Sequence, residues 1–289
     1  MCEKKKAPLG QGVLSMALAN FDSWLRSPRT ILMLLFIAAI CYLQMCGYEM
    51  KLNETGYTMH LGETLFYEFK FGCNMPMTTV LFLIMVSELP RRIAYQQYSL
   101  IRSSRCRWMA AQLLYCLMMV VAMIALIALF IALMALPLVT PGNGWSDAAR
   151  IASGEIEPYE ALISEFILNN YTPFTATLLA MIPVFCFWLT MVFMILMFGV
   201  WGSPVFGVLM YAFLMVANVT ILFEAFPFQL ILPIQYATLD NIISGYDGKE
   251  IQQLLKVIGV YAALIVSLVV VMMISVKRVE LNFHAESKQ

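Results

Sequence analysis

Charged residues are scarce in this chain. Asp, Glu, Lys and Arg together make up 12% of its 289 residues, whereas soluble domains typically contain about 25%. Hydrophobic residues account for 61%, and the mean hydropathy is +0.79. A soluble chain of this length could not bury so much apolar surface away from water. The composition therefore excludes an ordinary soluble protein and predicts a chain that lies mostly in lipid.

Motifs typical of enzymes and metal sites are also absent from the sequence. It contains no Gly-x-x-x-x-Gly-Lys-Ser/Thr, no His-Glu-x-x-His and no Gly-x-Ser-x-Gly. The two histidines, His60 and His284, lie far apart, and the seven cysteines show no Cys-x-x-Cys spacing. We therefore expect no catalytic residue, metal site or cofactor in this chain. A net charge of zero likewise gives no reason to expect nucleic acid as a partner.

Six apolar runs are candidates for membrane-spanning helices. They cover residues 30–46, 75–89, 108–138, 174–200, 204–226 and 254–276. The fourth and fifth runs are joined by residues 201–203, and Pro204 opens the next helix, so we expect these helices to be antiparallel neighbours. An apolar segment broken by Pro227 and Pro233 precedes the sixth run. We interpret residues 227–250 as an external re-entrant element.

Residues 12–27 are expected to form an amphipathic helix at the membrane surface. Apolar side chains recur there at steps of three and four residues, and polar side chains fall largely elsewhere. The apolar face consists of Leu14, Ala17, Leu18, Phe21, Trp24 and Leu25, and the polar residues are Asn20, Asp22, Ser23 and Arg26. Such a helix, with lysines upstream, suits the cytoplasmic face of a membrane. The predicted fold class is an all-α polytopic membrane protein with six transmembrane helices, an amphipathic N-terminal interfacial helix and a re-entrant element before the sixth helix.

The distribution of basic residues orients the six predicted spans. With a cytoplasmic amino terminus, 13 of the 18 basic residues fall inside, namely Lys4, Lys5, Lys6, Arg26, Arg29, Arg91, Arg92, Arg102, Arg105, Arg107, Lys277, Arg278 and Lys288. The positive-inside rule then places both termini in the cytoplasm. The chain divides into a cytoplasmic tail with the interfacial helix at 1–29, a transmembrane domain at 30–276 with an external loop at 138–173, and a cytoplasmic tail at 277–289.

The most informative stretch lies between the second and third predicted spans. Residues 91–107 contain five of the 18 basic residues, and no Asp or Glu occurs between Glu88 and Asp147. One interpretation is that these arginines only enforce topology and contact anionic lipid. The other is a docking element for a second protein, in which arginines provide charge and Tyr95 and Tyr98 provide aromatic anchors.

Ionisable residues inside membrane spans are usually functional, and these spans contain almost none. Glu224 and Asn218, near the outer end of the fifth span, are candidates for an external gate, and the alternative is that Glu224 is solvated at the interface. Cys46 and Cys73 both fall near the predicted outer face. A disulfide between them and two unpaired thiols are the alternatives there.

The layout and one local motif resemble the type-2 ATP-binding cassette (ABC) exporter permeases. Glu88 ends the second span, and Tyr98-Ser99-Leu100-Ile101-Arg102-Ser103-Ser104-Arg105 and then Trp108 follow it. The resemblance implies a permease without a fused ATPase, which pairs with a second permease copy and docks a separate ATPase subunit that binds ATP and Mg²⁺. It also implies that 91–107 is the cytoplasmic coupling segment. The implied coupling residues are Glu88, Arg91, Arg92, Tyr95, Tyr98, Arg102 and Arg105.

On this resemblance we expect a multi-pass subunit in a bacterial plasma membrane. It would move an amphipathic or hydrophobic substrate outward by alternating access, for example an antimicrobial peptide, a drug or a lipid-like molecule. Two alternatives come from other classes of protein. A non-transporting membrane immunity or sensor scaffold would not need the docking segment, and an ATP-independent channel or carrier would work without any ATPase.

Overall fold

The computed structural model describes residues 9–55, 58–69, 74–90, 104–147, 149, 165–219, 239, 242 and 250–278. These residues are mostly helical. Four helical stretches are long and apolar enough to cross a membrane, and they are Pro28–Gly47, Arg105–Ala135, Pro173–Val200 and Ile251–Val276. This confirms the predicted class of helical membrane protein. Two other predicted spans coincide with shorter apolar helices, Met77–Val86 and Pro204–Phe213.

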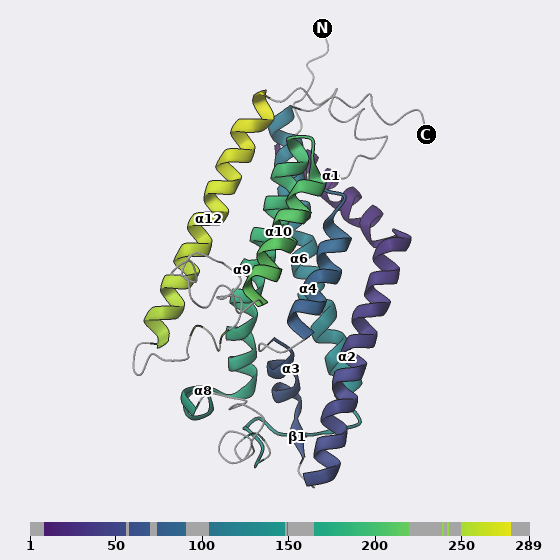
Figure 1. Ribbon diagram of the computed structural model, residues 1–289, viewed down its shortest axis with the longest axis vertical. Helices are drawn as coiled ribbons and strands as arrows, with labels where there is room; N and C mark the ends of the chain where they lie inside the picture. The colour runs from purple at the N-terminus through teal and green to yellow at the C-terminus, as the bar shows by residue number, and fades with distance from the viewer. Residues whose placement is uncertain are drawn as a thin grey trace.

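The elements follow one another in a simple order (Figure 1). They are α1 (Leu9–Leu25), α2 (Pro28–Thr55), β1 (Met59–His60), α3 (Leu61–Phe69), α4 (Asn74–Val86), α6 (Arg105–Ala135), β2 (Val139–Thr140), α8 (Glu165–Asn170), α9 (Pro173–Val200), α10 (Pro204–Val219) and α12 (Glu250–Arg278). The α2 helix continues past the predicted end of its span at residue 46. The α6 helix begins and ends about one turn earlier than the predicted span 108–138.

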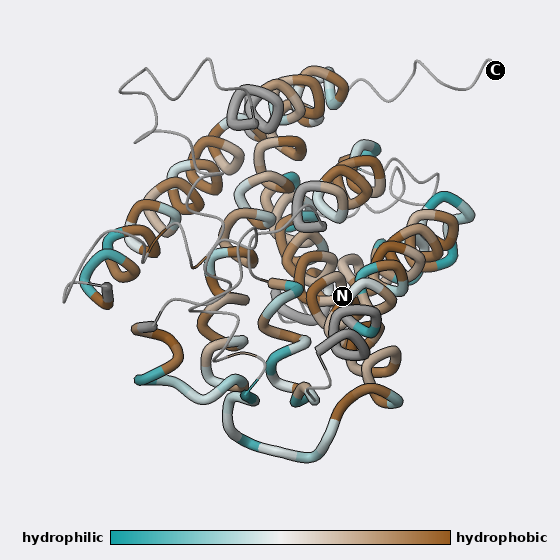
Figure 2. Tube along the Cα trace, turned by 60° about the horizontal axis from the view of Figure 1, so that its bottom comes forward, coloured by the Kyte–Doolittle hydropathy of each residue, from teal (hydrophilic) through white to brown (hydrophobic). Residues whose placement is uncertain are grey.

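The long helices run between two ends of an elongated bundle (Figure 1). We call the end that carries α1 the α1 end, and the end that carries the two short strands the β end. The α2 helix descends from the α1 end to the β end, α4 returns, and α6 descends again. Figure 2 shows hydrophobic residues along the long helices, with hydrophilic ones gathered at helix ends and in the loop at the β end.

The α9 helix is the centre of the bundle. It packs against α3, α4, α6, α10 and α12, and most of its residues are buried. The side chain of Trp188 packs against the ring of Phe82 of α4, with ring centroids 5.2 Å apart, and its Nε1 donates a hydrogen bond of 3.0 Å to Thr79 Oγ1. A buried indole N–H needs such a partner. This contact therefore sets the register of α4 against α9.

The turn between α9 and α10 is as predicted. Trp201 closes α9, Gly202 adopts a left-handed φ of 100°, and Pro204 begins α10. Glycine adopts this conformation without the steric penalty that a Cβ would bring. At Gly207 a Cβ would lie 3.0 Å from the Ile195 Cα, so the two antiparallel helices approach closely.

The predicted N-terminal helix is present as α1, but its faces differ from the expectation. Ala17, Asn20 and Trp24 are buried, and α1 packs against α6. Leu14 and Leu18 are about half exposed. Asn20 was predicted with the polar residues, and this was wrong because α6 covers that side of the helix. The helix thus has two sides with apolar residues, one buried against α6 and one exposed. The sequence pattern did not distinguish these two sides.

The β end contains elements that the sequence did not predict. Residues Met59 and His60 pair in parallel with Val139 and Thr140. The following helix, α3, buries seven of its nine residues against the bundle and packs against α6 and α9. It is not one of the apolar helices that could span a membrane. A short amphipathic helix therefore enters the bundle beside the ends of the long ones.

Candidate functional site

The α1 end has a corner where four helices meet, which we call the Glu88 corner. Glu88 follows the last turn of α4, and Arg29 lies in the first turn of α2. Arg29 Nη1 is 2.8 Å from Glu88 Oε1 and donates a hydrogen bond of 3.3 Å to Ser87 Oγ. Both charged side chains are about half exposed. The ion pair therefore contributes less than about 1 kcal/mol to stability, because water and salt screen it.

A small pocket lies behind this ion pair. Its lining comes from α1, α2, the end of α4 and α6, namely Trp24, Ser27, Arg29, Thr30, Met85, Val86, Glu88, Leu89 and Tyr115. Leu89 and Tyr115 are buried. Gly199 of α9 presses against the Leu89 carbonyl, where a Cβ would collide with backbone. The Glu88 corner therefore brings together α1, α2, the end of α4 and α6, with α9 packed against Leu89.

The α6 helix, which follows the Glu88 corner in the sequence after residues 91–103, begins at an N-cap residue, Ser104. Ser104 adopts an extended backbone, and its Oγ accepts a hydrogen bond of 3.4 Å from the Arg107 backbone N–H. Serine is a preferred residue at this position because it satisfies an otherwise unpaired N–H. Arg105 is the first helical residue, and Trp108 is buried. The basic segment thus runs from the Glu88 corner to the capped start of α6.

The predicted coupling residues are only partly within the described chain. Glu88 lies at the corner, and Arg105 opens α6. The others, Arg91, Arg92, Tyr95, Tyr98 and Arg102, lie outside the described residues. Sequence reasoning assigned Arg29 only to topology and missed its pairing with Glu88. The break at Ser27 and Pro28, which places Arg29 in the first turn of a new helix, was the available clue.

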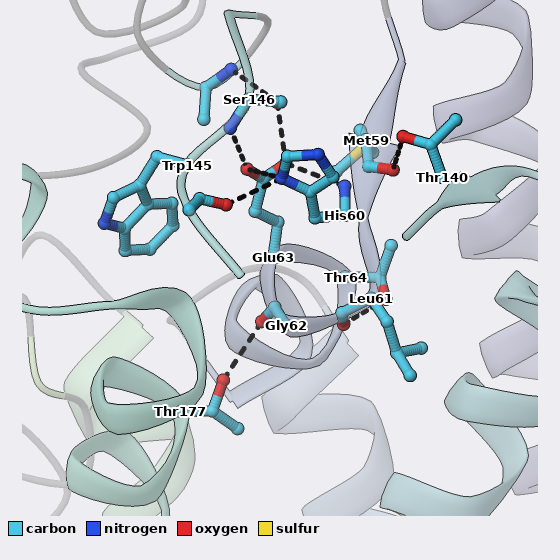
Figure 3. Close-up of polar contacts among 12 residues, drawn as sticks. Met59, His60, Leu61, Gly62, Glu63, Thr64, Thr140, Trp145, Ser146 and Thr177 are labelled. Carbon is cyan, nitrogen blue, oxygen red and sulfur yellow. Dashed lines mark hydrogen bonds and ion pairs between the residues drawn. The ribbon is translucent and has the colours of Figure 1, made fainter. Parts of the chain in front are cut away.

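A second polar cluster, which we call the Glu63 clasp, lies at the β end (Figure 3). The Glu63 carboxylate is completely buried and accepts hydrogen bonds from the Ser146 backbone N–H, from Ser146 Oγ at 2.8 Å and from the His60 backbone N–H at 3.3 Å. His60 Nδ1 lies 3.7 Å from Glu63 and 2.6 Å from the Gly144 carbonyl oxygen. These donors compensate the desolvation of the carboxylate.

The Glu63 clasp has the residue types of a hydrolase triad but not its geometry. Ser146 Oγ donates to Glu63, and His60 Nδ1 is directed to the Gly144 carbonyl, so the serine and the histidine are each engaged with another group. A nucleophilic serine needs the histidine as its base. Trp145 beside it donates from Nε1 to the Tyr171 carbonyl at 2.7 Å and packs edge-on against Phe66. The clasp therefore ties α3 to the segment after β2.

Glu68 is the second buried acid of α3 and has a different environment. Its exposed fraction is 4%, and its Oε2 has no hydrogen-bond partner among the residues that the structure describes. The side chain of Gln44 in α2 donates the hydrogen bond that it does receive. Burial raises the pKa of Glu68 to about 7, and the Gln44 hydrogen bond lowers it only in part. The sequence analysis missed both acids because acidic residues before a span are usually solvated.

Only some of the remaining predicted site residues lie within the described part of the chain. Asn218 lies in α10, and Glu224 and the segment 227–238 lie outside the described residues. Cys46 lies in α2, and Cys73 lies outside the described residues, so the disulfide stays a prediction. Within the described ranges, no three His, Cys, Asp or Glu side chains gather to hold a metal ion.

The helices and their composition define a helical membrane protein with four apolar helices of spanning length. Comparisons with protein-family models, with curated proteins and with solved structures find no match. The class of the protein therefore rests on its own composition and fold.

Proposed function

We propose that this chain is the transmembrane permease subunit of an ABC exporter in a bacterial plasma membrane. In this proposal six helices cross the membrane, with α4 and α10 completed by neighbouring residues and both termini in the cytoplasm. The α1 end faces the cytoplasm and the β end faces outside. A separate ATPase supplies the energy, and a second permease copy completes the transport path. The cargo is amphipathic or hydrophobic.

The observation that carries the proposal is the position of the basic segment. Residues 91–103 connect the Glu88 corner to the Ser104 cap of α6, and both of these lie at the α1 end. Five arginines lie in 91–107. A partner that pulls on this segment acts on the end of α4 and on the start of α6. Through Arg29 and the pocket residues it also acts on α1 and α2.

The ion pair at the corner suits such a transmitting role. Half-exposed charges contribute little to stability, so the Arg29–Glu88 pair can break and reform at small cost. Buried Leu89 and Gly199 instead form a close contact between the end of α4 and α9. Switching proteins commonly combine weak polar contacts with rigidly packed helices in this way.

The test is co-purification of the chain with an ATPase encoded by the adjacent reading frame, followed by assays of ATP turnover and transport. We expect the ATPase to bind the unmodified chain and the double variant Arg102→Gln/Arg105→Gln to lose most of this binding. Arg278→Gln, which removes a basic residue at the end of α12, is the matched control and should bind normally. Transport that persists with a catalytically inactive ATPase, or without any, would instead support a carrier or a scaffold.

A further inference from the structure

We propose that Glu68 is a proton-binding site: a carboxyl group that takes up and releases a proton at the contact between α3 and α2. The site is separate from the Glu88 corner, because it lies toward the β end. It does not rest on the ATPase-coupled function, and its ligand is a proton rather than a transported molecule.

The two buried acids of α3 show why Glu68 in particular would hold a proton. Glu63 receives hydrogen bonds from two backbone N–H groups and one hydroxyl, which occupy its carboxyl oxygens. Within the described part of the chain, Glu68 receives one hydrogen bond, from Gln44, and its Oε2 is buried without a partner. An ionised carboxylate in that environment leaves an uncompensated charge, which is costly. A protonated carboxyl group removes the charge.

Among the described contacts Glu68 has no basic partner, and the basic group of the adjacent β1, His60, lies against Glu63 and the Gly144 carbonyl instead. From α2, Gln44 and the thiol of Cys41 interact with it. The sequences of α4 and α9 contain no Asp, Glu, Lys, Arg or His, and α6 contains none after Arg107. On α3 itself the other acid is Glu63, which its own donors satisfy. Lys70 follows in the sequence and lies outside the described residues, so it enters the test below.

Protonation at this place would control how firmly α3 sits in the bundle. When Glu68 is neutral, α3 can remain packed against α6 and α9 with seven of its nine residues buried. When it is ionised, water or a cation must reach the carboxylate, which separates α3 from α2. The value of about 7 for the Glu68 pKa places this change near neutral pH.

The sign of the stability effect follows from the raised pKa of Glu68. The folded protein holds this proton more tightly than the unfolded chain, whose ordinary value is 4.5. The stabilisation is therefore complete below 4.5 and is lost as the pH rises through about 7. We expect the melting temperature of the full chain in detergent to fall across this window. Glu68→Gln, which keeps the neutral shape, should remove that fall, matching the wild type at about pH 5 and exceeding it at about pH 8.5.

The matched control is Glu49→Gln, which changes an exposed glutamate of α2 and should leave the pH dependence intact. Infrared spectroscopy provides a direct readout, because a protonated carboxyl band should disappear as the pH rises through about 7. That band should be absent in Glu68→Gln. Gln44→Leu removes the hydrogen bond that favours the ionised form, so it should move the midpoint to higher pH. This variant tests the site even if Glu68→Gln does not fold.

Two results would overturn the inference. One is a pH dependence of the melting temperature that persists unchanged in Glu68→Gln. The other is a Glu68 carboxyl that is already ionised at about pH 6 in the wild type and becomes protonated in Lys70→Gln, which would identify an ion pair. Because no ATPase is present in these measurements, they cannot be confused with a failure of the proposed exporter function.

Discussion

At the scale of single residues, the two glutamates of α3 differ in how many hydrogen-bond donors surround their carboxyl groups. Glu63 accepts hydrogen bonds from two backbone N–H groups and one hydroxyl, whereas Glu68 has one donor and an unpartnered oxygen among the described residues. The number of donors, and not burial alone, separates them, because both are almost completely buried. A buried carboxylate with several donors stabilises the structure around it. A buried carboxyl group with one donor responds to pH.

We expect Glu63→Gln to lower the free energy of unfolding by about 1–3 kcal/mol, because the amide NH2 replaces one acceptor oxygen and leaves a buried donor without an acceptor. Ser146→Ala should cost less, since the backbone N–H at 146 remains. Because both changes break the same contact, the double variant should lose less free energy of unfolding than the sum of the losses in the two single variants. Denaturant unfolding of the purified chain measures all three. Fully additive effects would show that Glu63 and Ser146 do not act together.

At the scale of elements, glycines decide how closely the helices approach one another. Gly199 near the end of α9 faces the Leu89 carbonyl, and Gly207 of α10 faces the backbone of α9 at Ile195. Gly259 of α12 is exposed, and among the described residues no atom lies within 4 Å of where a Cβ would stand. The same residue type therefore has a packing role at the Glu88 corner and none on the exposed side of α12.

Gly199→Ala should destabilise the protein by about 1–3 kcal/mol, because the added methyl group collides with rigid backbone and pushes α9 from the end of α4. Gly259→Ala is the matched control and should be neutral or stabilising by up to about 1 kcal/mol, since alanine favours a helix. Melting temperatures of the two variants in the same detergent provide the comparison. Equal shifts in the two variants would contradict the close contact at Gly199.

At the scale of the whole molecule, the two ends differ in what holds them together. The α1 end is joined by the half-exposed Arg29–Glu88 pair and by apolar packing around Leu89. The β end is tied by the paired strands and by the buried Glu63 clasp. Weak polar contacts open more easily than buried, fully hydrogen-bonded ones. If the protein works by alternating access, we therefore expect the α1 end to rearrange more readily.

The proposed orientation predicts which end reagents can reach in intact cells. Asn143 at the β end and Ser15 on α1 are both exposed. We expect a membrane-impermeant maleimide to add one gel shift to Asn143→Cys in intact cells, beyond the labelling of the unsubstituted chain. Ser15→Cys should show its extra shift only after permeabilisation. The reverse pattern would place the α1 end outside and remove the basis for cytoplasmic docking.

Much of the fold could be predicted from local composition. The apolar runs predicted the long helices, and Pro204 after a three-residue link predicted the α9–α10 turn. Periodicity predicted a helix at the amino terminus but placed Asn20 on the wrong side, because α6 decides which side is covered. The α3 helix was missed because its buried acids make it resemble a solvated loop in the sequence.

The candidate sites were predicted less completely. The charge pattern showed a basic interruption between apolar runs, and the family resemblance implied Glu88 and Arg105 as coupling residues, a role that stays a prediction. Arg29 was not paired with Glu88, which is 59 positions away by their residue numbers. Glu63 and Ser146 are likewise separated by 83 positions. No local pattern connects residues at such distances.

The sequence by itself determined that the chain is a helical membrane protein, roughly where its long helices lie, and where its basic segment falls. These properties depend on the transfer of each segment from water to lipid, which is a local free energy. Only the tertiary structure decided which polar groups meet. It paired Arg29 with Glu88, supplied Glu63 with donors, and left Glu68 buried with a single one. The physical reason is that a buried charge is stabilised by groups that helix packing brings near it, and those groups come from distant parts of the chain.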